Sequence, residues 1–297
     1  MDLVAIAPRG FEQVLREELG ERLISEHGRV FFVRGQDPIY WAQNLWLSPR
    51  IFDFQSISQA AKHLRSIQRN WWLHSVDHHR RAKLIQGELP PIKSKRIDFL
   101  SPIPQAPLGS WTLLEPGKLL YSAQCSSAFP DGQIEFKENK LDPPSRAYLK
   151  LWEIFTLEGF HPSGGARVLD LGSSPGGWTW VLDQLGCDVI SVDKAPLSKK
   201  TKFSERVEML NESAFGLEPD RVGQVEWLFS DIICYPDRLL QLVRKWLDHI
   251  PNMICTIKFQ GTTDHKTVKE FLMIPNSKVL HLSCNKHELT WVRYCKS

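Results

Sequence analysis

The stretch that decides the fold of this protein is VLDLGSSPGGWTW, residues 168–180. It begins with a short apolar run typical of a buried strand, passes through a glycine-rich turn from Gly172 to Gly177, and becomes helical near Trp178. Glycines at such a turn let a ligand approach the backbone, and the start of a helix presents free N–H groups. In open α/β sheets, ligands bind outside the carboxyl ends of the strands. The segment therefore predicts a ligand site at the end of a parallel strand.

Strand-like and helical segments alternate regularly around this turn. Helices are expected at 145–158, 178–186, 237–250 and 264–272, and strands at 166–171, 188–193, 207–211, 225–232 and 253–259. Two last strands, 278–284 and 289–295, are joined by a short turn and predict a hairpin. This alternation predicts an open, mostly parallel α/β sheet, to which the hairpin adds an antiparallel strand.

The first part of the chain has a less regular pattern. Strands are expected at 4–7, 28–35, 50–57, 110–116 and 118–125, and helices at 11–23, 37–46 and 58–72. The Pro-, Gly- and Asn-rich stretch 129–146 predicts a boundary. We therefore expect a small α+β domain, ferredoxin-like, at residues 1–140 with its linker, and a second domain at residues 141–297.

Composition excludes several classes of protein. With 297 residues, of which 42% are hydrophobic and 24% charged, wholesale disorder is excluded. No apolar run approaches the roughly 18 residues of a membrane helix, and the opening residues lack the basic region of a signal peptide. The six cysteines are scattered without a C-x-x-C pair, which argues against a disulfide framework or a zinc site. We expect a cytoplasmic, two-domain monomer without a metal.

One stretch of the first domain is strongly basic. Residues 62–96 hold nine Lys and Arg against two acids, a local net charge of +7, and include Trp71 and Trp72. Basic residues mixed with aromatics are typical of a nucleic-acid-binding surface, and a solvated helix face is the alternative. The two tryptophans either stack on an unpaired base or belong to the core. The residues expected to contact phosphates are Arg65, Arg69, Arg80, Arg81 and Lys83.

The glycine spacing narrows the choice of ligand. A dinucleotide site reads G-x-G-x-x-G, whereas Gly172 is followed by Gly176 and Gly177. Asp193 ends the next strand, 21 residues after Gly172, and an acid there accepts from the ribose hydroxyls of either NAD or S-adenosylmethionine. Asp170, inside the strand before the glycines, and the terminal hairpin favour S-adenosylmethionine. The alternative is a turn that only permits close packing.

Together these motifs resemble the FtsJ-type ribose 2′-O-methyltransferases. The segments that resemble the family are SRAYLKL at 145–151, the loop LDLGSSPGGWT at 169–179, SVDKAPL at 191–197 and TIKF at 256–259. Their combination is most similar to the RlmM subgroup, which methylates a cytidine ribose of bacterial 23S ribosomal RNA. More loosely, APRGFEQVLREEL and PIYWAQNLW resemble the RNA-binding, THUMP-containing arm of that subgroup, and SSAFPDGQIEF resembles its linker.

The resemblance implies an S-adenosylmethionine-dependent methyltransferase that acts on 23S ribosomal RNA before or during subunit assembly. It implies a catalytic set of Lys150, Asp231, Lys258 and Glu288. Lys258 is expected to act on the 2′-hydroxyl, and Asp231 to orient Lys258 near the methionine ammonium. Lys150 is expected to position the ribose or tune Lys258, and Glu288 to support them. A ribose hydroxyl is a poor nucleophile, so catalysis reduces to placing its oxygen and handling its proton.

The resemblance also implies a set of cofactor-binding residues: Asp170, Gly172, Ser173, Ser174, Pro175, Gly176, Gly177, Trp178, Asp193, Glu212, Ser213 and Asp231. Trp178 is expected either beside the methionine moiety or in the core. The family commonly has an acid after the third strand that contacts the adenine amino group. Here Ser213 holds the aligned position, with Glu212 beside it.

Three other functions remain as alternatives. An RNA-binding or ribosome-assembly protein with this fold but no turnover has the change at Ser213 as its support. Methylation of a base amine usually uses an Asn/Asp-Pro-Pro-aromatic turn after the fourth strand, which SDIICYP, residues 230–236, lacks. A nicotinamide dehydrogenase conflicts with the glycine spacing.

Overall fold

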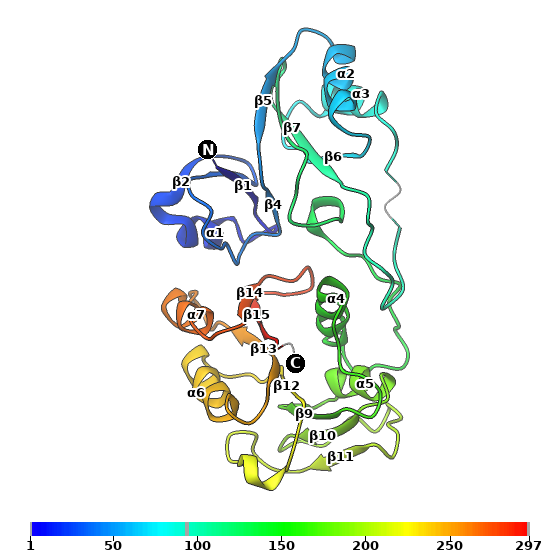
Figure 1. The fold of residues 1–297 in the computed structure, drawn as a ribbon, viewed down its shortest axis with the longest axis vertical. Helices are drawn as coiled ribbons and strands as arrows, with labels where there is room; N and C mark the ends of the chain where they lie inside the picture. The colour runs from blue at the N-terminus through cyan, green and yellow to red at the C-terminus, as the bar shows by residue number, and fades with distance from the viewer. Residues whose placement is uncertain (1, 93–94, 296–297) are drawn as a thin grey trace. The chain divides into compact units, whose positions relative to one another are not determined.

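A computed structural model describes residues 2–92 and 95–295 of the chain. Its internal contacts divide it into two compact units, residues 1–136 and 137–297, and each is described by itself. This division falls four residues before the boundary that the sequence predicts at 140. Both units combine strands and helices (Figure 1).

The second unit is built on a seven-stranded sheet with the order β11-β10-β9-β12-β13-β15-β14. The strands are β9 (Arg167–Leu171), β10 (Asp188–Val192), β11 (Val207–Leu210), β12 (Trp227–Ser230), β13 (Asn252–Lys258), β14 (Ser277–Leu280) and β15 (Glu288–Arg293). The first five run parallel, and β15 pairs antiparallel with both β13 and β14. The predicted architecture, a Rossmann-like, mostly parallel sheet with an antiparallel terminal hairpin, is confirmed.

Four helices pack on this sheet: α4 (Tyr148–Glu158), α5 (Gly177–Gln184), α6 (Pro236–Trp246) and α7 (His265–Leu272). Figure 1 shows α4 and α5 on one face and α6 and α7 on the other. Helix α6 begins at Pro236, whose fixed φ suits the first helical position. Helix α7 begins after Asp264, whose Oδ1 accepts a hydrogen bond from the backbone N–H of Thr267 at 3.0 Å. Central strands that are covered on both faces are mostly apolar, and β9, β12 and β13 consist largely of buried apolar residues, with Asp170 of β9 as a buried acid.

The terminal hairpin differs from its prediction in one respect. Strand β14 ends at Leu280, so the connection to β15 is the loop 281–287 and not a short turn. The buried carboxylate of Glu153 on α4 accepts a hydrogen bond from the backbone N–H of Ser283 at 2.8 Å. This long-range hydrogen bond holds residues 281–287 away from the strand ladder.

The first unit contains two four-stranded sheets. One has the antiparallel order β2-β3-β1-β4 and contains β1 (Leu3–Ile6), β2 (Leu23–His27), β3 (Val30–Val33) and β4 (Asn44–Trp46). The other has the order β5-β8-β7-β6 and contains β5 (Arg50–Asp53), β6 (Trp71–Leu73), β7 (Gly109–Glu115) and β8 (Lys118–Ser122). The helices are α1 (Glu12–Leu19), α2 (Ile57–Ile67) and α3 (His79–Gly87), with short 3₁₀ turns at Gly20–Arg22, Pro130–Gly132 and, in the second unit, Pro219–Arg221.

The helix predicted at 37–46 is wrong. The backbone N–H groups of Tyr40 and Trp41 donate to the carboxylate of Glu18 at 2.7 and 2.9 Å, so they cannot form helical bonds. The residues that follow form β4, where Trp46 pairs with Val4 of β1. The described residues 2–53 therefore have one helix between their strands, where a ferredoxin-like fold has two.

The helix predicted at 58–72 ends early. Helix α2 stops at Ile67, and Trp71 pairs with Gly109 as part of strand β6. Trp71 is fully buried, and its Nε1 donates to the backbone oxygen of Leu64 at 2.9 Å. Of its two predicted roles, Trp71 therefore has the core one. The sequence prediction also missed β2 and α3.

Candidate active site

The strand order of the second unit changes direction at β9. Strands β10 and β11 extend to one side of it, and β12 and β13 extend to the other. In open α/β sheets, ligands bind at such a switch point, outside the carboxyl ends of the strands. A cavity of about 430 Å³ opens at this point. It is lined by Ser145, Ala147, Asp170, Gly172, Ser173, Ser174, Pro175, Gly177, Trp178, Asp193, Asp231, Ile232, Ile233 and Lys258.

Gly172 brings the turns after β9 and β12 into direct contact. Its φ is +77°, and a Cβ placed there would lie 2.7 Å from Cβ of Ile232. A side chain at this position would therefore meet both backbone strain and a clash. The glycine at this position lets the loop after β12, which carries Asp231, pack against the cofactor loop.

Asp170 lies buried at the floor of the cavity. Its Oδ2 accepts a hydrogen bond from Thr179 at 2.6 Å, and its Oδ1 is buried with no hydrogen-bond partner among the described residues. Burial raises the pKa of Asp170 to about 7, and the negative charge of Asp231 also raises it. An unpaired buried carboxylate oxygen is costly, so it marks a place where a ligand donor fits.

Asp193 directly follows the neighbouring strand β10 and accepts a hydrogen bond from the glycine loop. Its Oδ2 accepts from the backbone N–H of Ser174 at 3.1 Å, and its Oδ1 accepts from Ala195 at 2.9 Å. The side chain is partly exposed and lines the cavity. It can still accept from ligand hydroxyls because each carboxylate oxygen has a second lone pair.

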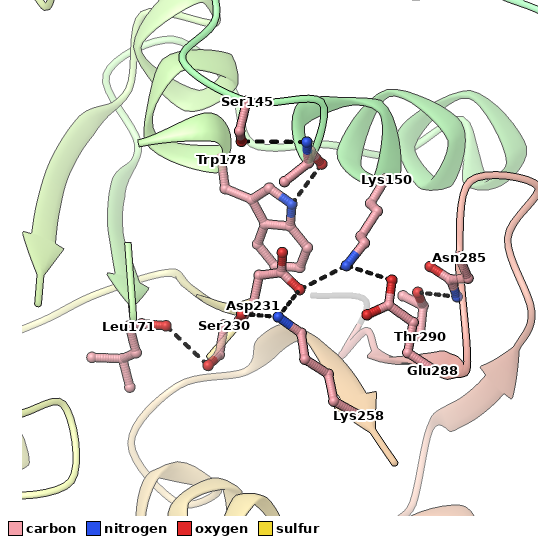
Figure 2. A network of polar contacts seen from close by, with 11 residues as sticks. Ser145, Lys150, Leu171, Trp178, Ser230, Asp231, Lys258, Asn285, Glu288 and Thr290 are labelled. Carbon is pink, nitrogen blue, oxygen red and sulfur yellow. Dashed lines mark hydrogen bonds and ion pairs between the residues drawn. The ribbon is translucent and has the colours of Figure 1, made fainter. Parts of the chain in front are cut away.

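The four residues expected to be catalytic meet in one chain of charges that alternate in sign. Figure 2 shows Lys150 between the carboxylates of Asp231 and Glu288, with Lys258 on the far side of Asp231. Nζ of Lys150 lies 2.7 Å from Oε1 of Glu288 and 2.8 Å from Oδ1 of Asp231. The same Asp231 oxygen lies 3.1 Å from Nζ of Lys258. Four segments that are distant in the sequence thus supply one network.

The two lysines of this network face different surroundings. Lys258 lines the cavity, whereas the side chain of Lys150 is only 9% exposed and lies behind Asp231. Burial lowers the pKa of Lys150, but the charges of Asp231 and Glu288 outweigh burial, so its pKa is raised above the ordinary value. Lys150 is therefore held as a cation, and Lys258 is the lysine that a substrate can reach.

Sequence reasoning did not single out Glu153, a buried acid on α4. Glu153 lies one turn after Lys150, is 4% exposed, and accepts hydrogen bonds from Ser283 and Cys284 in the loop before β15. Burial raises its pKa to about 7, although these hydrogen bonds oppose the rise. The signal that could have identified it is an acid three residues after a lysine on an otherwise apolar helix.

Trp178 is a core residue that also lines the cavity. It is 2% exposed, and its Nε1 donates to the backbone oxygen of Ala147 at 2.9 Å. Its ring also packs edge-on against Phe229, with ring centroids 6.3 Å apart. The hydrogen bond of Trp178 to Ala147 therefore connects the start of α4 to the cavity wall.

Three of the residues expected to bind the cofactor do not line the cavity: Gly176, Glu212 and Ser213. Gly176 has a φ of +108°, and a Cβ placed there would lie 2.7 Å from the ring of Phe203, so its role is in the turn itself. Glu212 forms an ion pair with Arg221 at 2.7 Å. An acid that is already paired is a weaker candidate for an adenine contact than the sequence alone indicated.

Most of the residues expected to contact phosphates lie on α2 and α3, two helices that pack side by side (Figure 1). Arg65 is exposed in the last turn of α2, Arg69 is exposed two residues beyond its end, and Arg80 and Lys83 are exposed on α3. Arg81 is half-buried, with its guanidinium 5.5 Å from the ring centroid of Phe54. Lys93, part of the same basic stretch, lies outside the described residues. Trp72 is half-buried and lines a surface hollow that it shares with Lys83.

The cavity and three of the four residues of the charge network lie in a segment that matches a known family. The model of the FtsJ-like methyltransferase family matches residues 143–279. This matched segment of 137 residues thus resembles an FtsJ-like methyltransferase domain. Asp170, Asp231 and Lys258 all fall within it. Glu288 follows it on the terminal strand.

Several curated relatives of this segment carry the same name. A "Ribosomal RNA large subunit methyltransferase M" from Alkalilimnicola ehrlichii is 39% identical over 112 residues, which cover 35% of this chain and 30% of the relative. A protein of the same name from Pseudoalteromonas atlantica is 30% identical over 185 residues, or 56% of this chain and 51% of the relative. The matches thus span about half or less of these relatives.

Among solved structures, a ribosomal RNA methyltransferase from Plasmodium falciparum is 16% identical, with a TM-score of 0.39. That match covers 50% of this chain and 96% of the other. The assignment of the fold therefore rests on the family match and on the strand order of the methyltransferase domain. Within the described residues, no helix is long and apolar enough to cross a membrane.

Proposed function

We propose that this protein transfers a methyl group from S-adenosylmethionine to a ribose 2′-hydroxyl of ribosomal RNA. The observation that carries the proposal is the alternating network of Lys150, Asp231, Lys258 and Glu288 at the edge of the cofactor cavity. A transfer to a base amine would need a different polar turn after β12, and residues 230–236 do not supply it. The names of the curated relatives support ribosomal RNA of the large subunit as the substrate. The resemblance to the RlmM subgroup supports a cytidine of 23S ribosomal RNA, in the cytoplasm.

The residues at the cavity fit S-adenosylmethionine. The unpaired Oδ1 of Asp170 would accept a hydrogen bond from the methionine ammonium, and Asp193 would accept from the ribose hydroxyls. The backbone of the Gly172–Gly177 turn would lie against the ligand, as the absence of side chains allows. When bound, this cofactor supplies a methyl group on a positively charged sulfur, which is already a strong electrophile.

The protein's own residues would then position the nucleophile and handle its proton. Asp231 accepts hydrogen bonds from Lys258 through its side chain and its backbone oxygen, which holds Nζ at the edge of the cavity. Lys258 in its neutral form would take the proton of the 2′-hydroxyl while that oxygen bonds to the methyl carbon. Lys150 stays charged and keeps Asp231 in place, and Glu288 fixes Lys150.

The first unit would select the RNA. Its exposed cations on α2 and α3 suit phosphate contacts, which provide affinity without reading sequence. Arg65, Arg69, Arg80, Arg81 and Lys83 are the residues proposed for these contacts. The methyltransferase domain would then act on a nucleotide that this arm presents, as a monomer on ribosomal RNA before or during subunit assembly.

The test is methyl transfer from labelled S-adenosylmethionine to ribosomal RNA from cells that lack the gene, followed by alkaline digestion. A 2′-O-methyl group blocks cleavage, so the label should remain in alkali-resistant dinucleotides. Lys258→Ala should reduce transfer roughly 100- to 10,000-fold, the usual size of a lost general base. Arg244→Ala, which removes an exposed cation paired with Glu270 at 2.9 Å, is the control and should retain activity.

Other outcomes would favour other functions. Label in ordinary mononucleotides would mean base methylation and would contradict the role given to Lys258. A wild-type protein that binds cofactor and RNA but transfers nothing, even to precursor ribosomal particles, would be an assembly protein without turnover.

A further inference from the structure

Two large apolar side chains are exposed beside the charge network. Ile233 is 79% exposed and Tyr235 is 60% exposed, in the segment that joins β12 to α6. The described interior of the methyltransferase domain buries most side chains of this size. Single exposed apolar residues are ordinary, but two that flank a reactive site point to contact with a substrate.

The segment that carries these side chains is held firmly at both ends. At its start, Ile232 packs against Gly172, as the 2.7 Å approach of a Cβ placed on that glycine shows. At its end, Pro236 is buried and begins α6. The exposure of Ile233 and Tyr235 is therefore a feature of a packed loop.

Burial alternates along this loop. Cys234, between the two exposed side chains, is only 7% exposed and lies at a bend of the chain. Ile233 and Tyr235 are therefore the apolar side chains that this loop presents to solvent, whereas Cys234 belongs to the core.

The first of these side chains lies at the reactive end of the cavity, and the second follows two residues later. Ile233 lines the same cavity as Asp231 and Lys258. A ribose whose 2′-oxygen meets Nζ of Lys258 has its base on the neighbouring ring carbon, so the base must lie at the cavity edge. Phosphates favour cations and N–H donors, whereas the flat face of a base suits an aromatic ring and an aliphatic side chain.

We propose that Ile233 and Tyr235 form the binding site for the base of the target nucleotide, with the base stacked on the Tyr235 ring. The inference rests on the proposed ribose methylation and adds a subsite to it. A base can reach the ring only when it is out of its helical stack, so the site takes an unpaired nucleotide. Stacking tolerates every base, and this pair therefore sets position more than base identity.

The first test compares Tyr235→Ala, Tyr235→Phe and Ile233→Ala with the wild type. The alanine variant at Tyr235 should raise KM for ribosomal RNA roughly 5- to 150-fold, the range of one lost stacking contact, and leave cofactor affinity unchanged. The phenylalanine variant keeps the ring and should behave like the wild type. Met273→Ala removes another apolar side chain, 81% exposed at the end of α7, and should change neither constant.

The second test removes the base of the target nucleotide instead of the tyrosine ring. Once the methylated nucleotide is mapped, two matched RNA fragments are made, with and without the base at that nucleotide, both keeping its ribose. The wild type should act more weakly on the abasic fragment, and Tyr235→Ala should show little further loss. Such non-additivity is expected only if the ring and the base touch.

The outcomes separate the subsite from the proposed function. Alkali-resistant label with equal KM values for wild type and Tyr235→Ala would overturn the subsite and leave ribose methylation standing. If the losses from the abasic fragment and from Tyr235→Ala were fully additive, the subsite would likewise be overturned and ribose methylation would stand. Loss of activity only on assembled precursor particles would show that the surface meets a ribosomal protein, and would also overturn it. No transfer by the wild type would overturn both proposals. Thermal unfolding checks that each variant is folded.

Discussion

Lys150 and Asp231 form an ion pair behind the candidate active site, with 2.8 Å between Nζ and Oδ1. The lysine comes from a helix and the acid from the end of a strand, 81 residues apart in the sequence. Because Lys258 shares the same carboxylate oxygen, Lys150 determines how firmly Asp231 can hold the residue that faces the substrate. The pair thus connects the buried interior of α4 to the reactive edge of the cavity.

Lys150→Met should destabilise the protein by about 3–5 kcal/mol, because it leaves the buried Glu288 without its cation and takes from Asp231 one of its two cations. Equilibrium unfolding in urea measures this loss. The double variant Lys150→Met with Glu288→Gln should recover part of it, since the unpaired charge of Glu288 is then gone. Equal stability of wild type and single variant would show that the network contributes nothing.

The raised pKa of Lys150 predicts the pH range of this stabilisation. A lysine whose pKa is raised by folding contributes stability at pH values below its unfolded pKa, and loses it as pH rises through the folded value. The difference in stability between wild type and Lys150→Met should therefore be constant from pH 7 to 9 and shrink above pH 10. Unfolding at stepped alkaline pH tests this, and a difference that shrinks below pH 9 would contradict it.

Asp170→Asn should weaken S-adenosylmethionine binding roughly 10- to 150-fold, the usual contribution of a hydrogen bond to a charged group. The pKa of Asp170 is raised to about 7, so below pH 7 the free protein holds a proton that the ligand ammonium must displace. Wild-type affinity should therefore rise from pH 6 to 7.5, and the variant should lose this dependence. Isothermal titration calorimetry in buffers of different ionisation heat measures both affinity and proton release. Parallel pH profiles for wild type and variant would contradict the prediction.

Glu153→Ala should lower methyl transfer roughly tenfold or more, because the loop that leads to Glu288 loses its anchor on α4. Glu153→Gln keeps one acceptor oxygen and should lose less. The pKa of Glu153 is raised to about 7, so the folded protein keeps this carboxyl protonated at pH values where the unfolded chain has lost the proton. The free energy of unfolding of the wild type should therefore fall as pH rises from about 4.5 to 7. Relative to wild type, Glu153→Gln should therefore gain stability between pH 5 and 8. Unfolding curves at both pH values test this.

Removing Arg80 and Lys83 together should weaken RNA binding similarly for all sequences, and should reduce the dependence of log K on log salt by about 2. Arg16→Ala is the matched control, because Arg16 is a paired cation of the same unit, 2.8 Å from Glu26. Filter binding at several salt concentrations gives the slopes. An unchanged slope would mean that the basic stretch is a solvated helix face.

The sequence alone determined the local elements of the methyltransferase domain. Each strand around the glycine turn is a short apolar run with a clear stop, so Asp231 and Lys258 could be placed at strand ends from neighbouring residues. The first unit was harder to predict. The carboxylate of Glu18 takes the backbone N–H groups of Tyr40 and Trp41, and no periodicity within residues 37–46 could show that.

Only the tertiary structure decided what these residues do together. The sequence places Lys150 on a helix and Glu288 near a turn, but their ion pair exists because β15 inserts between β13 and β14 and brings Glu288 to α4. Likewise, pairing with β7 makes Trp71 a core residue, and the packing of Ile232 on Gly172 leaves Ile233 exposed. Propensity and periodicity act over a few residues, whereas burial and charge pairing depend on which distant segments become neighbours.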